Sequence, residues 1–189
     1  MSTLHPPKTW TAEEFERLDD DLRYELTRGE LRPMPPPPGA EHGSLTIDLT
    51  LEVGLFVREH RLGRCFAAET RFTIERNPDT VVAPDMAYVA RERLPAKMPA
   101  GFLDLAPDLV LEVRSPSDRK REVKEKVERW LAAGVRMVWE LHPARRILTV
   151  YRPGAEAREP GIDDTLSGED VLPGFALPLR RLLSEADEI

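Results

Sequence analysis

Hydrophobic residues recur along the chain at two spacings, one typical of helices and one typical of strands. From about residue 41 to 59, apolar side chains return every three or four positions, which predicts a long amphipathic helix. A second helix is predicted from Ser117 or Asp118 to about Ala133, ending at Gly134, with a buried stripe of Val123, Val127, Trp130 and Leu131. A short helix begins at Thr11, which forms a capping box with Glu14, and ends in the acidic run 19–21.

Runs rich in β-branched and aromatic residues predict strands between these helices. A hairpin is expected over 23–31, around Arg28-Gly29, and the tail is expected to hold two short strands and a helix near 179–186. Further strands are predicted at 65–68, 70–75, 81–89, 135–141 and 146–151. This order of elements indicates an α/β fold with a mixed sheet, and the strand-helix-strand passage at 107–141 favours a right-handed parallel crossover.

The stretch Pro107-Asp-Leu-Val-Leu-Glu-Val-Arg-Ser-Pro-Ser117 contains the most informative strand. Its continuous apolar run is typical of a central strand that is covered on both faces. Glu112 interrupts this run, and a buried carboxylate is costly unless it is paired, hydrogen-bonded or bound to a metal. Because side chains alternate along a strand, Glu112 and Arg114 point to the same side. The stretch therefore carries an acid and a base at one sheet edge.

A second unexpected carboxylate, Asp85, lies in the apolar run 81–89. Pro84 precedes it and indicates an edge, a bulge or the start of a strand. If the two strands are neighbours, Asp85 and Glu112 converge, and such carboxylates are ligands that Mg²⁺ prefers. The alternative is that each acid pairs with an arginine and only shapes the fold. Spacing alone favours neither reading over the other.

Three other polar residues could contribute to such a site. Glu25 alternates with Tyr24 and Leu26, so it faces away from the apolar side and is expected to be exposed. His42 lies in the first turn of the long helix, where a solvated side chain is the default expectation. Lys126 flanks the buried stripe of its helix, so its ammonium group is expected to emerge beside the core.

Length and composition indicate one domain over residues 1–189, with residues 1–8 as a flexible N-terminal tail. The chain has 189 residues, of which 41% are hydrophobic, so it can bury a core. A net charge of −7 argues against broad attraction to nucleic acid, although a local basic groove stays open. Cys65 is the only cysteine, which excludes an intrachain disulfide and favours a small core residue. Without an apolar signal core or membrane-spanning segment, the sequence predicts a cytoplasmic protein with no membrane.

Several motifs, taken in order, resemble a known family. Pro84-Asp85, followed 27 residues later by Glu112-Val-Arg114, is similar to the Pro-Asp…(Asp/Glu)-x-Lys signature of restriction-endonuclease-like nucleases. The wider pattern resembles the Uma-type family of restriction endonuclease-like proteins over nearly the whole chain. It consists of Tyr24-Glu-Leu…Gly-Glu-Leu31, Pro84-Asp, the stretch 107–117, Lys126, Ala133-Gly-Val135 and Leu172-Pro-Gly-Phe175. This resemblance implies a mixed sheet flanked by helices, with the site at one sheet edge.

The resemblance also implies roles for individual residues. Asp85 and Glu112 would hold Mg²⁺ (or Mn²⁺), with the carbonyl of Val113 as a third ligand and Glu25 as a further acid. Arg114 fills the usual lysine position, but arginine does not lose its proton and cannot act as a base. Lys126 is therefore favoured as the catalytic cation, with Arg114 as a substrate contact or a substitute.

These expectations lead to one main hypothesis and two alternatives. The main hypothesis is a Mg²⁺-dependent endonuclease that hydrolyses DNA phosphodiesters with metal-activated water, working as a homodimer. The first alternative is a nuclease fold without catalysis that serves as a binding or assembly module, which the acidic net charge and Arg114 favour. The second is metal-dependent hydrolysis of another phosphate ester.

Overall fold

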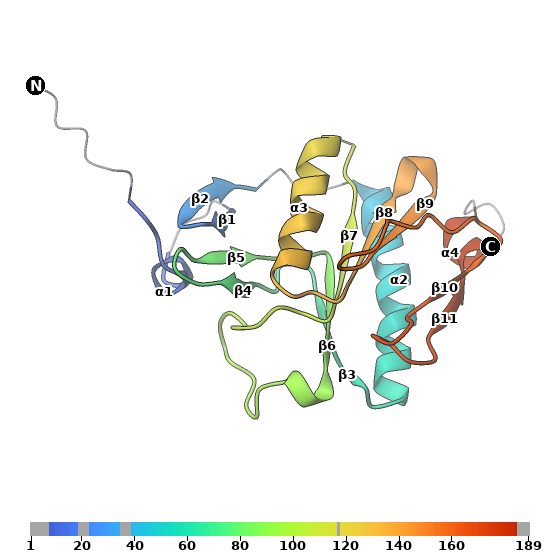
Figure 1. Ribbon diagram of the computed structural model, residues 1–189, viewed down its shortest axis with the longest axis horizontal. Coiled ribbons are helices and arrows are strands. Elements are labelled where there is room, and N and C mark those ends of the chain that lie inside the picture. The colour runs from blue at the N-terminus through green and yellow to red at the C-terminus, as the bar shows by residue number, and fades with distance from the viewer. Residues whose placement is uncertain (1–7, 19–22, 35–38, 117, 185–189) are drawn as a thin grey trace, which may run out of the picture.

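A five-stranded mixed sheet forms the centre of the computed structural model, which describes residues 8–18, 23–34, 39–116 and 118–184 (Figure 1). The strands run in the order β3-β6-β7-β8-β9, with these bounds: β3 Gly63–Ala67, β6 Met86–Ala90, β7 Leu109–Val113, β8 Met137–His142 and β9 Ile147–Tyr151. Strands β7 and β8 are parallel and the other neighbours are antiparallel, so the predicted mixed sheet is confirmed.

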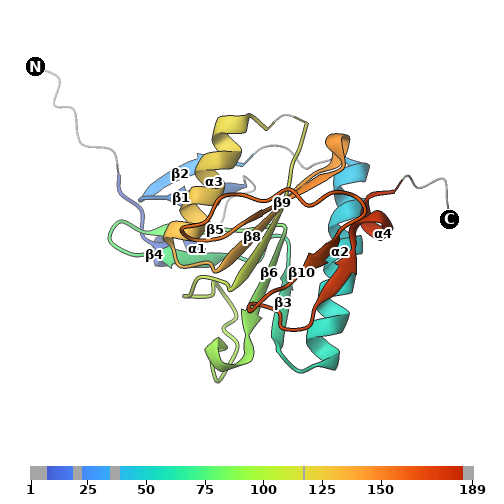
Figure 2. The same cartoon turned by 45° about the vertical axis from the view of Figure 1, so that its right-hand side comes forward.

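One helix covers each face of this sheet. Helix α2 (Ala40–Glu59) packs Leu49, Val53 and Val57 into a core that includes Leu109, Leu111, Val113 and Trp139. Helix α3 (Lys120–Ala132) packs Val127 and Trp130 against Val110 and Val138 on the opposite face (Figure 2). The central strand β7 is therefore buried on both sides, as its continuous apolar run predicts.

A second, four-stranded sheet in the order β2-β1-β5-β4 adjoins the main one. Its strands are β1 Tyr24–Thr27, β2 Glu30–Pro33, β4 Phe72–Glu75 and β5 Thr80–Val82. The hairpin turn at Arg28-Gly29 has positive φ at both residues (50° and 78°), as a two-residue hairpin turn of the primed type requires. Helix α1 (Ala12–Glu16) has the predicted capping box of Thr11 and Glu14, and its Phe15 packs beside this sheet.

The C-terminal part of the chain packs on the α2 side of the molecule. Strands β10 (Thr165–Ser167) and β11 (Ala176–Pro178) form a hairpin, and helix α4 (Leu179–Leu183) follows at once. Phe175 stacks edge-on against Phe56 of α2, with ring centroids 5.4 Å apart. Two short 3-10 turns, η1 (Arg91–Arg93) and η2 (Pro143–Arg145), complete the elements of the described residues.

The predicted strand over 81–89 is wrong in one respect, because the chain changes sheets in the middle of it. Strand β5 ends at Val82 in the small sheet, and β6 begins at Met86 in the main one. Pro84 lies in the gap, where its missing N–H cannot continue a strand ladder. Asp85 is thus presented at the point where the two sheets meet.

Smaller differences concern the ends of helices and one side chain. Helix α3 starts at Lys120 with Arg119 as its N-cap, because the Asp118 carboxylate instead accepts the Ser115 N–H; Ser117 lies outside the described residues. Helix α1 ends at Glu16, and the acidic run 19–21 also lies outside them. Cys65, expected in the core, is half-buried at its edge, and burial raises the pKa of its thiol to about 12.

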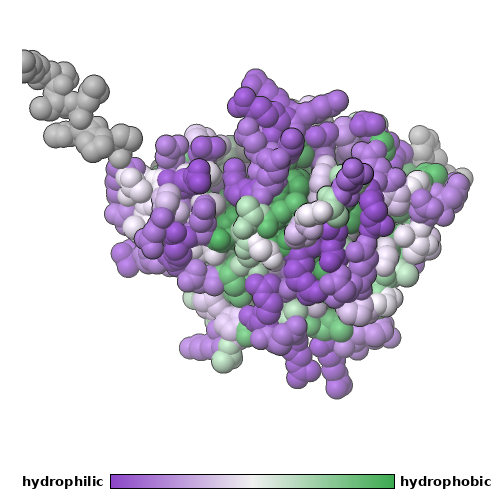
Figure 3. All heavy atoms as spheres, viewed as in Figure 1, coloured by the Kyte–Doolittle hydropathy of each residue, from purple (hydrophilic) through white to green (hydrophobic). Residues whose placement is uncertain are grey.

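The surface of the protein is mainly polar on the face seen in Figure 3. Hydrophilic residues cover most of the face seen in Figure 3, and hydrophobic ones come to the surface mainly around the C-terminal end of α3. Over the described ranges, no helix is both long enough and apolar enough to cross a membrane.

Candidate functional site

Asp85 and the C-terminal end of β7 lie together where the two sheets meet. The backbone N–H of Val113 donates a hydrogen bond to Asp85 Oδ2 over 2.7 Å. Asp85 is partly exposed, with 23% of its side chain accessible, so the carboxylate is fixed by the strand and still reaches solvent. The strand that carries Glu112 therefore also orients Asp85, although the two residues are far apart in the sequence.

Glu112 is buried and hydrogen-bonded through both carboxylate oxygens. Lys126 Nζ lies 2.6 Å from Oε2, and the indole N–H of Trp130 donates to Oε1 over 2.7 Å. Burial raises the pKa of Glu112 to about 7; the negative charge of Asp85 adds to this, and Lys126 opposes it. The charge of Asp85 thus acts on Glu112, and the ion pairs of the described residues give Glu112 a lysine partner and no arginine.

Lys126 provides the positive charge of the site. Burial lowers the pKa of its ammonium group, but the charges of Glu112, Glu25 and Asp85 together raise it above its ordinary value. About a third of the side chain remains accessible (35%), so the group borders the solvent. At neutral pH it is a protonated cation, suited to hold negative charge rather than to accept a proton.

Sequence reasoning missed the position of His42. Its side chain is buried, 9% accessible, and its Nε2 lies 3.4 Å from Asp85 Oδ2. Burial lowers the pKa of the imidazole, but hydrogen bonding to Asp85, the charge of Asp85 and hydrogen bonding to the backbone of Val113 raise it overall. The expectation of a solvated helix-end histidine is therefore wrong.

Glu25 is also less exposed than predicted. It is half-buried, with 19% of its side chain accessible, and its Oε2 lies 3.7 Å from Arg129 Nη1 of α3. Its charge contributes to the raised pKa of Lys126, which places it in the electrostatic surroundings of the site. The alternation in β1 does point Glu25 away from the apolar core, but α3 covers that side.

Arg114 is engaged in a separate ion pair. Its Nε lies 2.5 Å from Oε1 of Glu140, the residue of β8 that is directly beside Glu112 in the parallel register. The Tyr151 hydroxyl donates to the other carboxylate oxygen of Glu140 over 2.6 Å. Both Arg114 and Glu140 are largely buried. The sequence gives no signal for Glu140, which pairs with the guanidinium group that the family resemblance assigns to substrate contact.

The residues of the site fit a hard divalent cation by donor type. Two neighbouring carboxylates and a backbone carbonyl are oxygen ligands that Mg²⁺ and Mn²⁺ accept, and a cation between them would offset the mutual repulsion of Asp85 and Glu112. In the arrangement of the described residues, however, no group of three or more His, Cys, Asp or Glu side chains forms a ready metal cluster. The Lys126 and Trp130 hydrogen bonds would compete with a metal for Glu112.

Comparison with known proteins gives a family match and a structural match. Residues 12–180 match a family model, Uma2, described as "Putative restriction endonuclease". A crystal structure described as a "putative nuclease belonging to DUF820" from Anabaena variabilis ATCC 29413 superposes with a TM-score of 0.80 and 24% identity, covering 92% of this chain and 97% of that one. Among curated proteins, no match is found. The structural match shows that the fold is shared.

Proposed function

Because this chain belongs to the Uma2 family of restriction endonuclease-like proteins, we propose that it is a Mg²⁺-dependent nuclease that hydrolyses phosphodiester bonds of DNA. The observation that supports the proposal is that Asp85 and the buried Glu112–Lys126 pair lie together at the C-terminal end of the central strand β7. The carboxylates of Asp85 and Glu112 suit a metal ion, and the adjacent cation Lys126 suits a phosphate. A cytoplasmic location fits a DNA substrate.

In this proposal each residue has a defined task. Asp85 and Glu112 hold Mg²⁺ or Mn²⁺, with the carbonyl of Val113 as a further ligand, and the metal supplies activated water and positive charge at the phosphate. The protonated Lys126 donates hydrogen bonds to the phosphate oxygens as their negative charge grows. Glu25 keeps Lys126 protonated. Arg114 positions Glu140 beside Glu112 and does not contact the substrate.

His42 is a positioning residue in the same proposal. Its imidazole touches two of the groups assigned to the metal, the Asp85 carboxylate and the Val113 backbone. It thereby fixes the separation between them before a cation arrives. Metal ligands that are already fixed in place need less reorganisation when the cation binds.

The test is cleavage of supercoiled plasmid DNA in Mg²⁺, in Mn²⁺ and in EDTA. The wild-type protein is expected to nick the plasmid only with a metal, and Asp85→Ala is expected to abolish nicking. Asp163→Ala removes an exposed carboxylate that pairs with Arg180, so it serves as the matched control and should cleave normally. Calorimetric titration with Mn²⁺ should show binding to the wild type and to Asp163→Ala, but not to Asp85→Ala.

A second candidate function is a nuclease fold that binds or assembles without cleaving. It is favoured by the hydrogen bonds that occupy both oxygens of Glu112 and by the guanidinium of Arg114 at the usual lysine position, locked against Glu140. Absence of metal binding, together with metal-independent retention of DNA, would support it over cleavage. Metal binding without cleavage of any nucleic acid would instead indicate another phosphate ester as substrate.

We also propose that the protein acts as a homodimer. An enzyme that cuts both strands of a duplex needs two sites, and two-fold dimers are the commonest soluble oligomers. Light scattering after size-exclusion chromatography measures this directly.

A further inference from the structure

Helix α2 carries an apolar stripe on the side that faces away from the sheet. Of the four large hydrophobic side chains that are exposed in the described residues, three lie on this helix: Ile47 (51%), Leu51 (52%) and Leu55 (54%). They are spaced four residues apart, so they form one continuous line on the helix surface. The buried residues Leu49 and Val53 face the opposite way. Such a patch is typical of a surface that binds another molecule.

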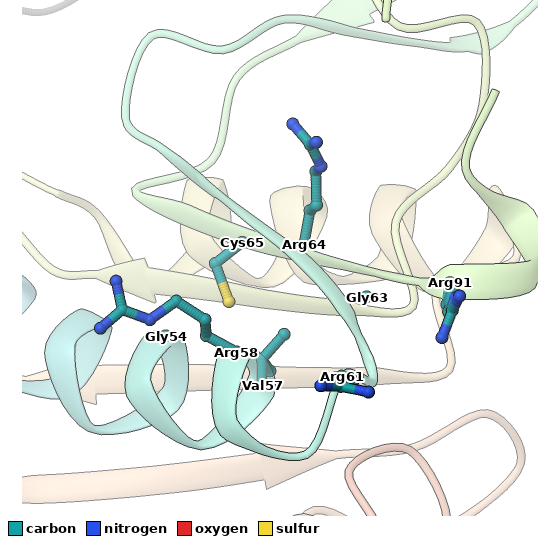
Figure 4. Close-up of a pocket in the computed structure, with 8 residues that line it drawn as sticks. All are labelled: Gly54, Val57, Arg58, Arg61, Gly63, Arg64, Cys65 and Arg91. Carbon is teal, nitrogen blue, oxygen red and sulfur yellow. The ribbon is translucent and has the colours of Figure 1, made fainter. Parts of the chain in front are cut away.

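An arginine cluster lies at the C-terminal end of the same helix. Four arginines line a hollow between the end of α2, strand β3 and the start of η1: Arg58, Arg61, Arg64 and Arg91 (Figure 4). The figure shows that their guanidinium groups fan outward, with Arg61 and Arg91 on the same side. None of the four takes part in the ion pairs found among the described residues, whereas arginines elsewhere in this acidic chain commonly pair with carboxylates.

These arginines are too far from the candidate site of their own chain to serve it. His42 marks the site at the N-terminal end of α2, and Arg58 lies 16 residues further along. At about 1.5 Å per residue, the helix separates them by ~24 Å. A cluster of unpaired guanidinium groups is well suited to bind phosphate, but it lies at the wrong end of the helix for the phosphate that is cleaved.

We propose that two copies of the chain pair through the apolar stripes of their α2 helices, antiparallel about a two-fold axis at Leu51. This inference rests on the proposed function, and it adds that each site is completed by the arginine cluster of the other copy. Ile47 and Leu55 lie four residues on either side of Leu51, so each meets the other across the axis. Glu41 lies ten residues before Leu51, and Arg61 lies ten residues after it, in the turn that follows the end of α2, so the pairing brings Glu41 near the turn that carries Arg61 of the partner subunit.

The distribution of charge along α2 favours a second copy of the chain as the partner, and it favours the antiparallel orientation of the two helices. The exposed charges near the stripe are Glu41 and Asp48 in the N-terminal half of α2, and Arg58, Glu59 and Arg61 at its C-terminal end, where Arg64 and Arg91 of the cluster make the charge positive on balance. Antiparallel pairing of two copies brings the acidic half against the basic end, whereas parallel pairing would bring like charges together. An isologous two-fold interface requires this self-complementarity. Nucleic acid is a poor occupant because the stripe is apolar and flanked by acids.

The consequence is a site shared between protomers. In the antiparallel pair, the C-terminal end of one α2 lies beside the N-terminal end of the other, so the arginine cluster of one copy borders the site that contains His42 and Asp85 of its partner. The arginines then contact the phosphates that flank the cleaved bond. This accounts for a basic cluster on a chain with a net charge of −7, at a distance from its own carboxylates.

The first experiment measures oligomeric state by sedimentation equilibrium. Wild type is expected to be a dimer at micromolar concentration, and Leu51→Lys is expected to raise the dissociation constant at least a hundredfold. Ile162→Lys changes the fourth exposed hydrophobic residue, which is outside α2, and should leave the dimer intact. Glu41→Arg should weaken the dimer, and the double change Glu41→Arg with Arg61→Glu should restore it. A monomeric wild type, or a dimeric Leu51→Lys, overturns the proposal.

The second experiment mixes two inactive variants. Asp85→Ala lacks its own carboxylate. The triple variant Arg58→Gln, Arg64→Gln, Arg91→Gln lacks three of the four arginines of the cluster and keeps Arg61, which faces Glu41 in the proposed interface. If the cluster acts on the partner's site, a mixed dimer contains one complete site, and an equimolar mixture should recover about a quarter of wild-type cleavage. No recovery overturns the shared site. If the wild type does not cleave but Leu51→Lys still dissociates the dimer, the proposed function fails and the interface stands.

Discussion

A buried acid lies near each end of strand β7, and the two acids have different neighbours. Asp108, just before the strand, is fully buried and accepts the Ala90 N–H over 2.8 Å; Arg93 and Arg136 lie 2.9 Å and 3.6 Å from its other oxygen. Glu112, near the opposite end, faces a lysine, an indole N–H and the negative charge of Asp85.

This difference separates a structural acid from a candidate functional one. Two guanidinium groups neutralise Asp108, so its charge is matched and the carboxylate ties η1 and the start of β8 to the sheet. Glu112 has one lysine and one indole N–H as partners, and burial raises its pKa to about 7, an effect to which the charge of Asp85 adds. A buried acid with raised pKa beside a second acid is typical of a functional site. Burial of a carboxylate alone therefore does not distinguish the two roles; its neighbours do.

The largest expected effect is on cleavage, at the C-terminal end of β7. Glu112→Gln keeps the size of the side chain and removes the charge, so we expect kcat to fall by about 10³-fold, since metal and phosphate stabilisation are worth several kcal/mol. Plasmid nicking under single-turnover conditions measures this. Retained cleavage with normal metal affinity would show that Glu112 is structural, like Asp108.

At the other end of the strand, the expected effect is on stability. Asp108→Ala leaves the Ala90 N–H and two arginines without their common partner, so the free energy of unfolding should fall by about 2–4 kcal/mol. Urea unfolding followed by tryptophan fluorescence measures the change. The remaining folded protein should cleave at the wild-type rate. Loss of cleavage in fully folded Asp108→Ala would contradict the division between the two ends.

A smaller effect distinguishes the two cations near Glu112. Lys126→Gln should lower kcat by about 10²-fold, because a preorganised charge at the phosphate is lost. Arg114→Gln should instead leave Glu140 with Tyr151 alone and lower stability, with kcat changed by less than tenfold. Parallel kcat and urea-unfolding measurements on both variants separate the roles. A larger kcat loss for Arg114→Gln would assign the catalytic cation to Arg114.

The sequence predicts most of the fold because its local signals agree with its tertiary structure. The capping box at Thr11, the positive-φ turn at Arg28-Gly29 and the spacing of the α2 and α3 stripes all correspond to observed elements. The main failure, at 81–89, arises because an apolar run has the same pattern whether it stays in one sheet or passes between two. Only Pro84 indicates the break.

The site is predicted in part, for a related reason. Asp85 and Glu112 are conspicuous because each is a charge in an apolar run, and the family resemblance adds Lys126. His42 has no such signal, since a histidine in the first turn of a helix looks the same whether or not a distant carboxylate is beside it. The pairing of Arg114 with Glu140 depends on the register of β7 and β8, which no local pattern specifies. Contacts of this kind are set by the tertiary fold.

The smallest expected effect is a dependence of metal affinity on pH, and it tests the cause of the difference between the two ends of β7. Burial and the charge of Asp85 raise the pKa of Glu112 from 4.5 to about 7, so below pH 7 the carboxyl group is mostly protonated in the folded protein. A cation must displace that proton, so the Mn²⁺ association constant should rise about fivefold from pH 6 to pH 7 and level off above pH 8. The same shift stabilises the fold at low pH. Between pH 4.5 and 7 the folded state keeps a proton that the unfolded state releases, so this contribution is fully present below pH 4.5 and is lost as the pH rises through 7. Calorimetric titrations between pH 5.5 and 8.5 measure the affinity. A profile that is flat over this range would mean that Lys126 keeps Glu112 ionised, and the two acids of β7 would then differ in their partners but not in their charge.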